Sequence, residues 1–446
     1  MRVALVTVYA HAGCTLKDVA GGYGTVFAVG SSWRARLLER AKARVAALPS
    51  LTLGYLAAQL ARAGHTVSAH EVRGADALPA VDAAVILSSM VDASAERDLA
   101  ARLRRRGIRT IVVGAFASAR PELYADGADV VVVGEPEALG AALLDTPDGV
   151  VRAGDAPDLD ALPFPDWSAF DVAGFRYAFL GFSAPTLPIG SARGCAYGCG
   201  YCPWRVTARF RERDPERVGR EVAHQVARHD ARGFAFRDPL FNLDRDRTLA
   251  LARALAPHGV RFSAEMRADR LDPALLDALA RAGLRSLEIG VESSDRALLA
   301  KERRNPPEAR VIEEVVRVAQ RRGVRVICNF ILGLPDDDEA SMRRTLAWAR
   351  RLDSFAVQFT VATPYPGTRL ADQVRALPLA PDAHTGFAPT FRHPRLGGAE
   401  LTTLREHAYV QHYFRPRYAA RFLRHAVPAL LEDVLGRGGR GDVPHA

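Results

Sequence analysis

The sequence predicts an α/β protein with two units, a doubly wound parallel sheet followed by a repeating strand–helix unit that closes into a full or partial barrel. Three observations support this prediction. Short apolar, β-branched runs are continuous rather than alternating, which is typical of parallel strands covered on both faces. Segments with helical period separate these runs across residues 1–140 and again across about 187–370. The 446 residues are also too many for a single hydrophobic core.

In the first unit, strand-like and helix-like segments alternate. Residues 51–63 and 95–106 have the period of amphipathic helices, and the first of these segments is followed by Gly64. The apolar runs predict strands at 3–8, 66–71, 83–87, 110–113 and 129–133. Ligands of such flavodoxin-like sheets bind at the carboxyl ends of the strands, so we expect a site there.

The rest of the chain divides by composition. Prolines punctuate aromatic residues across 151–184, which indicates a linker between domains 1–150 and 185–370. From 371 to 446 we expect a helical C-terminal region with a disordered, Gly- and Arg-rich end. Repeated strand and helix patterns predict the barrel in the second domain, with strands at 233–236, 261–265, 286–290, 324–332 and 356–361 and helices at 273–282 and 308–322.

Charge and hydropathy exclude some classes of protein. No apolar run approaches the ~18 residues that cross a bilayer. The net charge is +9, but nearly all of the basic residues are arginines interspersed with acids along helices, which indicates a solvated surface. A nucleic-acid partner is therefore not expected. The short apolar start of the chain lacks the features of a signal peptide, so we expect a cytoplasmic protein.

The strongest chemical signal is a group of three cysteines, Cys195, Cys199 and Cys202, within eight residues. Three thiolates on one loop can hold three corners of a [4Fe-4S] cluster and leave one iron open to an outside ligand. A structural zinc site would need a fourth protein ligand, and no histidine lies in this loop. The remaining alternative is that the cysteines only pack as small apolar side chains. Cys328, by contrast, alternates with apolar neighbours and is expected in the core.

The triplet, with Tyr201 just before its third cysteine, resembles the radical S-adenosylmethionine (SAM) superfamily. The resemblance spans about 185–370 and includes segments 236–241, 265–269, 287–293, 329–335 and 364–368, in the usual order. It implies a partial (β/α)6 barrel in which SAM chelates the open iron. Asp238 departs from the usual Gly-Gly-Glu-type contact, and Asp238 and Glu292 could instead begin a turn and cap a helix. The residues that the resemblance assigns to SAM are Tyr201, Asp238, Glu265, Arg267, Gly290, Glu292 and Asn329.

The first domain resembles the cobalamin-binding domain that precedes the barrel in one radical SAM subfamily. The matching segments are 53–65, 88–90, 113–118 and 134–137, although other flavodoxin-like sheets share such features. Small residues at strand ends let the backbone approach a corrin ring closely. The residues that the resemblance assigns to cobalamin are Gly22, Gly24, Ser88, Ser89, Gly114, Phe116, Gly134 and Glu135.

One departure concerns the lower face of the cobalt. Related proteins that ligate cobalt from below often carry Asp-x-His-x-x-Gly after the first strand. This chain has Tyr9 and Cys14 at the outer positions and matches only at His11. A ligating histidine normally needs a carboxylate partner. We therefore expect no histidine beneath the cobalt, with ligation by His11 as the alternative.

The resemblance implies a cobalamin-dependent radical SAM methyltransferase that acts on an unactivated carbon of a natural-product or peptide intermediate. A 5′-deoxyadenosyl radical would remove a substrate hydrogen, and methylcobalamin would supply the methyl group. The alternatives are non-methylating chemistry with the same cofactors, such as cyclisation, ring contraction or oxidation, and a non-catalytic carrier. The implied partners are a small-molecule or peptide substrate and an electron donor such as flavodoxin or ferredoxin. No catalytic acid or base is assigned.

Overall fold

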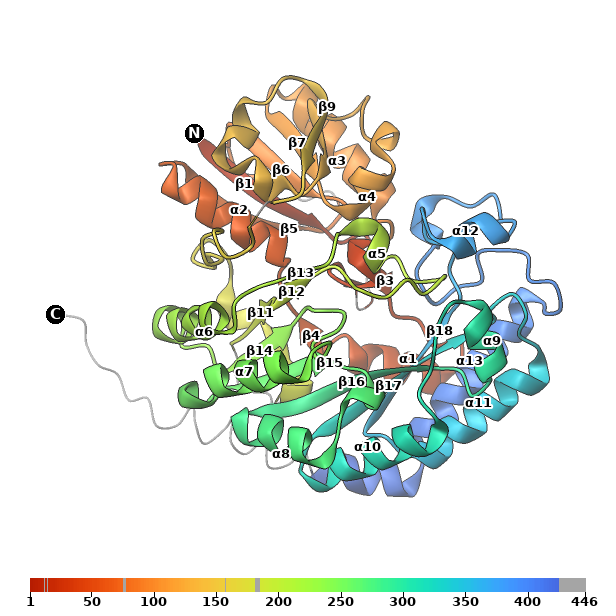
Figure 1. The fold of residues 1–446 in the computed structure, drawn as a ribbon. Coiled ribbons are helices and arrows are strands. Elements are labelled where there is room, and N and C mark those ends of the chain that lie inside the picture. Colours follow the sequence, from red (N-terminus) through yellow and green to blue (C-terminus); the bar gives the residue numbers. More distant parts are fainter. Residues whose placement is uncertain (12, 14, 75–77, 157, 181–184, 425–446) are drawn as a thin grey trace.

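The computed structural model describes residues 1–424 except 12, 14, 75–77, 157 and 181–184. It contains two parallel sheets of six strands and three small two-stranded sheets. Figure 1 shows the first sheet at the top, the barrel below it, and the segment that carries β12, β13 and α5 between them. The predicted α/β fold is confirmed. Cys14 and the Gly- and Arg-rich end of the chain lie outside the described residues.

The first sheet has the strand order β5-β1-β6-β7-β8-β9, and all neighbouring strands are parallel. In chain order this is 2-1-3-4-5-6, a flavodoxin-like order whose direction reverses between β1 and β6. Apolar side chains cover both faces, with Leu53 and Leu56 packed on one face and Leu99 and Leu103 on the other. Its strands are β1 (Arg2–Val8), β5 (Thr66–Val72), β6 (Ala83–Leu87), β7 (Arg109–Val113), β8 (Val130–Gly134) and β9 (Gly149–Gly154), and its helices are α2 (Leu51–Arg62), α3 (Ala93–Arg105) and α4 (Ala115–Ala119).

The second sheet is the predicted partial (β/α)6 barrel. Its order, β11-β14-β15-β16-β17-β18, follows the chain, and in the described part the first and last strands do not pair, so the barrel is open. The strands are β11 (Thr186–Ile189), β14 (Gly233–Phe236), β15 (Arg261–Glu265), β16 (Leu284–Glu292), β17 (Arg325–Leu332) and β18 (Ala356–Val361). The helices around them are α6 (Pro215–His229), α7 (Arg245–Leu255), α8 (Pro273–Ala282), α9 (Arg296–Lys301), α10 (Ala309–Arg321) and α11 (Glu339–Leu352).

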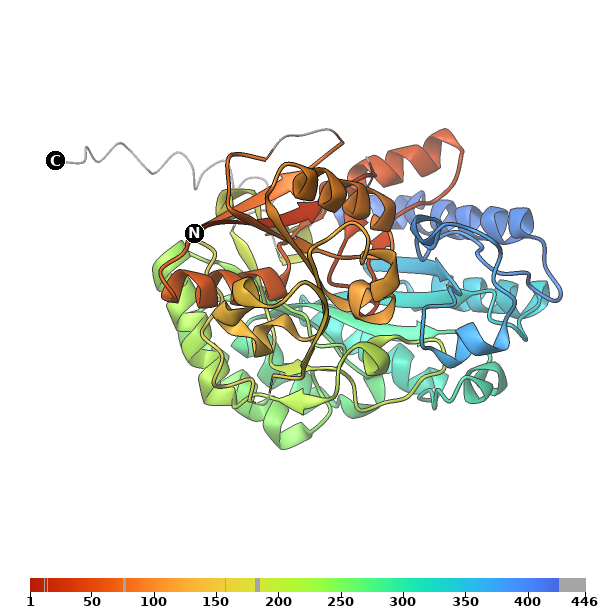
Figure 2. The same cartoon turned by 90° about the horizontal axis from the view of Figure 1, so that it is seen from above.

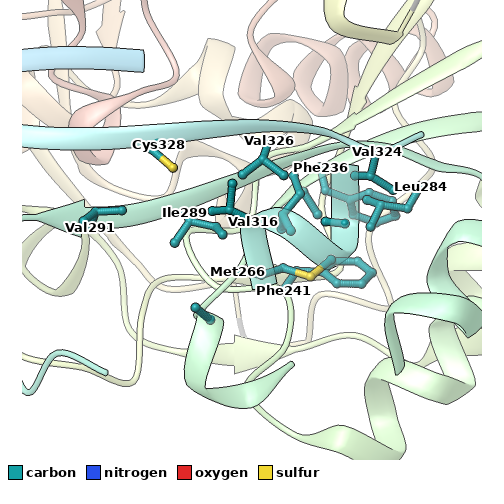
Figure 3. Close-up of a cluster of buried hydrophobic side chains, with 14 of the residues drawn as sticks. Phe236, Phe241, Met266, Leu284, Ile289, Val291, Val316, Val324, Val326 and Cys328 are labelled. Carbon is teal, nitrogen blue, oxygen red and sulfur yellow. The ribbon is translucent and has the colours of Figure 1, made fainter. Parts of the chain in front are cut away.

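Local sequence explains the helix ends of the barrel. In α8, Asp272 accepts a hydrogen bond from the Leu275 backbone N–H, and Pro273 occupies the first helical position. Gly283 then ends the helix at a φ of 113°. Between the helices and strands, the largest core contains the residues of Figure 3, and Cys328 lies among them, fully buried as the sequence predicts.

A segment near the N-terminus packs on the barrel rather than on its own sheet. Helix α1 (Trp33–Lys42) contacts α13 (Gly398–Tyr413), and Val29 and Ala35 belong to the core of the barrel. Figure 2 shows the red-orange α1 beside the blue α13, and Figure 1 shows α1 among the barrel elements, below the first sheet. Strand β4 (Ala46–Ala47) pairs with β10 (Arg176–Tyr177). The domain boundaries themselves stay a prediction, but residues of both predicted domains share one core here.

The segment predicted as a linker contributes to both units. Strand β9 begins at Gly149, runs to Gly154 and forms the edge of the first sheet, which the sequence analysis missed because its apolar run is short. Further along, Trp167 is fully buried in the barrel core, and its ring lies so close to Gly54 of α2 that a Cβ there would lie 2.4 Å away. The aromatic residues of this segment therefore pack between the two units.

The remaining elements are short, apart from the C-terminal helix α13. Among the described residues no helix has the length and apolar character needed to span a membrane. The helical C-terminal region is present, but the chain before α13 is largely irregular, with a 3-10 turn at Pro381–Ala383 and an antiparallel bridge between Ala376 and Phe391. The short elements are β2 (Thr15–Leu16), β3 (Thr25–Val26), β12 (Ala192–Arg193), β13 (Arg211–Glu212), α5 (Trp204–Thr207) and α12 (Arg369–Gln373).

Candidate functional site

The three-cysteine loop lies between β12 and α5 and is held by backbone contacts. The Gly200 N–H donates to the Glu302 carbonyl at 2.7 Å, and the Leu370 N–H donates to the Gly200 carbonyl at 2.9 Å. Gly194 starts the loop at a φ of 74°, and a Cβ there would lie 2.6 Å from the Ala208 carbonyl oxygen. Only glycine fits this position, because both the φ and the space exclude a side chain.

The thiols of the loop are partly buried and electrostatically coupled. Burial raises the pKa of Cys195 and of Cys202, and the Cys199 thiolate raises both further. Three thiolates are therefore unfavourable here without a bound cation, which fits a cluster whose irons neutralise them. In the described part of the chain no group of His, Cys, Asp and Glu converges as a mononuclear metal site would require. A cubane is ligated at three separate corners, so it does not need that convergence.

Glu292 and Gly290 lie beside this loop at the end of β16. Glu292 has a φ of 67°, and the pairing register with β17 shifts between the two residues. A Cβ on Gly290 would lie 2.5 Å from the Glu292 carboxylate, so the glycine makes room for that side chain. Burial raises the pKa of Glu292, and the positive charge of Arg304, at 3.7 Å, opposes the increase. A strained residue at a strand end is typical of a functional position rather than of a helix cap.

The other SAM candidates differ in what they contact. Asp238 is buried and accepts hydrogen bonds from the backbone N–H groups of Ser191 and Ala192, and burial raises its pKa to about 6. It therefore holds the start of the cysteine loop, and its contact with SAM stays a prediction. Arg267 donates to the Asp269 carboxylate at 2.9 and 2.6 Å, and its guanidinium lies over the Tyr197 ring.

A cavity of about 230 Å³ occupies the interior of the barrel, and Tyr201, Glu265 and Asn329 line it. Glu265 of β15 and Glu288 of β16 are register partners and face the same space. The Tyr177 hydroxyl donates to Glu288 at 2.5 Å. Among the described residues neither carboxylate forms an ion pair. Burial and the Glu288 charge raise the pKa of Glu265 to about 8, so this pair holds a proton near neutral pH.

Two further cavities, of about 150 and 610 Å³, lie between the carboxyl ends of the first sheet and the barrel. Gly22, Gly114 and Gly134 line them on the side of the sheet, together with Glu135. On the opposite side the walls come from the cysteine loop and α5, including Cys195 and Trp204. The glycine-bearing strand ends therefore face the three-cysteine loop, which the sequence alone could not show.

Glu135 joins the two units. It forms ion pairs with Arg193 at 2.9 Å and with Arg211, while Arg193 also contacts Glu137 at 3.0 Å. Both arginines belong to the β12–β13 hairpin that carries the cysteine loop. The carboxylate thus positions that hairpin against the first sheet.

The other residues assigned to cobalamin are not part of these cavity walls. Ser88 accepts a hydrogen bond from the Ala117 N–H at 2.9 Å, and Ser89 contacts both Lys17 and Glu96. Phe116 is buried in the core of the first unit. Gly24 has a φ of 82° and packs against Val91. These residues pack and form hydrogen bonds within the first unit, and their assignment to cobalamin stays a prediction.

His11 is turned toward the loop that follows β6. Its Nε2 lies 2.9 Å from the Val91 carbonyl oxygen, and the Asp92 carboxylate is 4.0 Å away. Tyr9 stands at the position of the usual aspartate. The positive charges of Lys17 and Arg73 lie over the face of its ring. The third residue of the comparison, Cys14, lies outside the described residues.

Sequence reasoning missed Glu288, Arg193 and Arg304. Glu288 could have been found, because it occupies a predicted barrel strand at the register of Glu265. Arg193 and Arg304 could not be distinguished in the sequence from the many other arginines. The partners of Arg193 are distant in sequence, and Arg304 reaches Glu292 only through a tight turn of the backbone.

The comparison with known families fits this geometry. Residues 189–349 match the family model of the radical SAM superfamily. The chain carries a radical SAM domain. Around this radical SAM domain the sequence is 24% identical over 271 residues to an uncharacterized methyltransferase of Pyrococcus horikoshii, covering 58% of this chain and 57% of that protein. It is 27% identical over 249 residues to the anaerobic magnesium-protoporphyrin IX monomethyl ester cyclase of Cereibacter sphaeroides, covering 53% and 39%. The chain thus spans little more than half of the first relative.

A solved structure has a similar fold over most of this chain. The radical SAM methyltransferase TsrM from Kitasatospora setae, solved with cobalamin and a [4Fe-4S] cluster, superposes with a TM-score of 0.59 at 16% sequence identity. The match covers 84% of this chain and 79% of TsrM. At this identity the likeness shows the fold, namely a flavodoxin-like sheet in front of a partial barrel.

Proposed function

We propose that this chain is a cobalamin-dependent radical SAM methyltransferase that methylates an unactivated carbon of a natural-product or peptide intermediate. One observation carries the proposal. The loop with Cys195, Cys199 and Cys202 lies between the cavities at the glycine-bearing strand ends and the cavity inside the barrel. Trp204 and Arg237 line both the cavity of about 150 Å³ at the strand ends and the cavity inside the barrel, so these two cavities adjoin. A substrate in the barrel would face both cofactor sites.

The residues divide into three sets. The cysteines would hold a [4Fe-4S] cluster, Gly290 and Glu292 would meet SAM beside it, and Gly22, Gly114 and Gly134 would let a corrin approach the backbone. When bound, these cofactors would supply a 5′-deoxyadenosyl radical and a transferable methyl group. The strand ends and the β12–β13 hairpin hold the sites in a fixed relation through Glu135, Arg193 and Arg211.

The chain's own residues in the barrel would orient the substrate and exclude water. The cavity is polar at Glu265, Glu288 and Asn329 and apolar at Ile327 and Ile331. Holding the reacting carbon in one orientation replaces a bimolecular encounter by a positioned one. The reducing electron would come from an outside protein such as flavodoxin or ferredoxin.

The cluster is tested by replacing Cys195, Cys199 and Cys202 together with alanine. Wild-type protein reconstituted without oxygen is expected to hold about four irons and four sulfides per chain, and the triple variant none. It should also form no 5′-deoxyadenosine. Cys328→Ala is the matched control, because that thiol is buried in the core away from the loop. Cys14→Ala is likewise expected to keep the cluster. A [4Fe-4S] spectrum in the triple variant would sink the assignment.

A second candidate function keeps the cofactors but transfers no methyl group. The similarity to an anaerobic cyclase favours it. The products separate the two candidates once a substrate is supplied. Methyl transfer yields both S-adenosylhomocysteine and 5′-deoxyadenosine, whereas cyclisation or oxidation yields no S-adenosylhomocysteine. Failure of the purified protein to take up cobalamin would contradict both.

A further inference from the structure

A second cavity of the barrel, of about 350 Å³, lies at the opposite end of its strands from the three-cysteine loop, beside the first residues of β17 and β18. Helix α1 and the chain from Tyr413 to Phe422 form part of its wall, and Phe27, Phe179 and Phe355 contribute aromatic rings. It shares no lining residue with the two cavities at the strand ends of the first sheet. A ligand held here would therefore not compete with the proposed cofactors.

Large apolar side chains are exposed around this apolar cavity. Leu37 is 51% exposed, and Phe414 and Phe422 are 38% and 44% exposed, although all three line the cavity. The exposed indole of Trp33 packs edge-to-face on the Phe414 ring. Four of the nine large apolar side chains that are exposed in the described part of the chain thus gather here. An apolar patch of this kind, with a cavity beneath it, indicates a binding site.

The apolar cavity adjoins the polar cavity inside the barrel. Lys42 lines both. At β4, β10 and β18, one of two neighbouring residues lines the apolar cavity and the other lines the barrel interior; the pairs are Val45 and Ala46, Ala178 and Tyr177, and Val357 and Gln358. A molecule seated in the apolar cavity could therefore extend past Lys42 into the barrel, where the substrate is proposed to react.

All of the charged side chains that line the apolar cavity are basic, namely Lys42, Arg44 and Arg325. The Lys42 ammonium lies over the rings of Phe27 and Phe179, at 5.6 and 5.5 Å from their centroids. The Arg325 guanidinium donates to the Phe179 carbonyl at 2.6 Å. Positive charge is thus held against an apolar wall, which favours a ligand that combines an apolar body with an anionic group.

We propose that the apolar cavity binds the apolar, acid-bearing part of the substrate, and that the substrate is an amphipathic acid. This inference rests on the proposed function and narrows its substrate class. The apolar body would lie among the aromatic rings, the anion near the basic side chains, and the reacting carbon in the barrel interior beyond Lys42. Burial of the apolar body supplies affinity, and this remote anchor orients the reacting carbon.

The apolar site is tested with two fluorescent probes that differ by one sulfonate group, 8-anilinonaphthalene-1-sulfonate and its uncharged parent N-phenyl-1-naphthylamine. Both are titrated into the purified full-length protein. Ala41→Trp, at an exposed position of α1, places an indole in the cavity wall and is expected to weaken both probes about tenfold. Ala227→Trp, at an exposed position of α6 away from the cavity, should bind both as wild type does. Equal affinities in the two variants would overturn the proposal.

The preference for an acid is tested with Arg44→Gln. This change is expected to weaken the sulfonate probe about two- to fivefold and to leave the uncharged probe unchanged, since only the sulfonate is attracted by the guanidinium. Arg40→Gln is the matched control, because Arg40 is an exposed arginine of the same helix that does not line the cavity. Equal losses in the two variants would overturn the proposed substrate class.

The connection to the barrel is tested with 4-benzoylbenzoic acid, an aromatic acid that reacts on irradiation. Its ketone carbon forms a bond to a nearby side-chain carbon, and the hydrogen of that carbon moves to the ketone oxygen. Peptide mass spectrometry locates the label. Label on Lys42, or on a barrel residue such as Ile327, supports the proposal, and the absence of label from all of these residues contradicts it.

Two other occupants of the cavity are outcomes of the same titration. Probe binding that appears only after residues 425–446 are deleted would show that the chain's own end covers the cavity. Probe binding that falls as the protein concentration rises would show that a second copy covers it. Either result contradicts the proposal. The probes need no cofactor, so a protein that holds cluster and cobalamin but binds no probe contradicts this inference alone. A protein that binds the probes but neither cofactor would instead contradict the proposed function.

Discussion

Glu265 and Glu288 face each other in the barrel cavity because their strands pair in register. Burial and the neighbouring carboxylate raise the pKa of Glu265 from 4.5 to about 8. The folded protein therefore binds this proton more tightly than the unfolded chain does. The resulting stabilisation is complete below about pH 4.5 and is lost as the pH rises through about 8.

We predict that Glu265→Gln removes this part of the pH dependence. The amide is neutral at all pH values. The free energy of unfolding of the variant minus that of wild type is therefore expected to be larger at about pH 9 than at about pH 5. Urea unfolding at both pH values measures the difference. Glu314→Gln, an exposed acid on α10, is the control. Parallel pH profiles for wild type and Glu265→Gln would show that the carboxyl pair is not coupled as described.

His11 is the second residue whose role can be tested. Its Nε2 contacts the Val91 carbonyl at 2.9 Å. The nearby Asp92 carboxylate is already paired with Lys17, and Tyr9 brings no negative charge at neutral pH, so neither supports His11 as a ligand. We predict that bound cob(II)alamin shows no nitrogen splitting from a lower axial ligand in its electron paramagnetic resonance spectrum. His11→Ala should leave that spectrum unchanged. A nitrogen-split spectrum that disappears in this variant would identify His11 as the ligand.

At the scale of elements, the β8–β9 edge of the first sheet depends on two glycines with similar backbones and different surroundings. Gly134 has a φ of 105°, and a Cβ there would lie 2.6 Å from the Gly154 carbonyl oxygen. Gly149 has a φ of 111°, and nothing lies within 4 Å of its Cβ position. Alanine substitutions at these two glycines therefore distinguish the cost of backbone strain from the cost of steric overlap.

We predict that Gly149→Ala costs about 1–2 kcal/mol of stability through the left-handed backbone alone. Gly134→Ala is expected to cost more, because the strands must also separate, and to weaken cobalamin binding at this strand end. Urea unfolding and cobalamin titration of the two variants provide the measurements. Equal losses of stability would mean that the close approach of Gly134 to β9 has no energetic consequence.

The elements also show the reach of local patterns. The strands 83–87, 233–236, 261–265 and 356–361 are predicted to the residue, since continuous apolar runs bounded by turns are read directly from the chain. Strand β9 and helix α1 were missed. The former has an exposed, weakly apolar pattern. The latter has charged residues at half of its positions and packs on α13.

At the scale of the whole molecule, Trp167 connects the two units. Its ring is fully buried in the barrel core and lies against Gly54 of α2, which belongs to the first sheet. We predict that Trp167→Ala costs about 3–5 kcal/mol and separates thermal unfolding into two transitions. Trp33→Ala is the control, because that indole is 67% exposed and should change stability by less than about 0.5 kcal/mol. A single unshifted transition in Trp167→Ala would contradict this role.

The sequence by itself determined the fold class, the order of the strands along the chain and the candidate cluster ligands. These depend on patterns within a few residues, such as a continuous apolar run or the spacing of Cys195, Cys199 and Cys202. Tertiary structure decided which groups meet. Glu265 lies opposite Glu288 through strand register, Glu135 meets Arg193 across two units, and Arg304 reaches Glu292 through one left-handed turn. Such contacts join residues far apart in sequence or depend on one backbone angle, and local periodicity records neither.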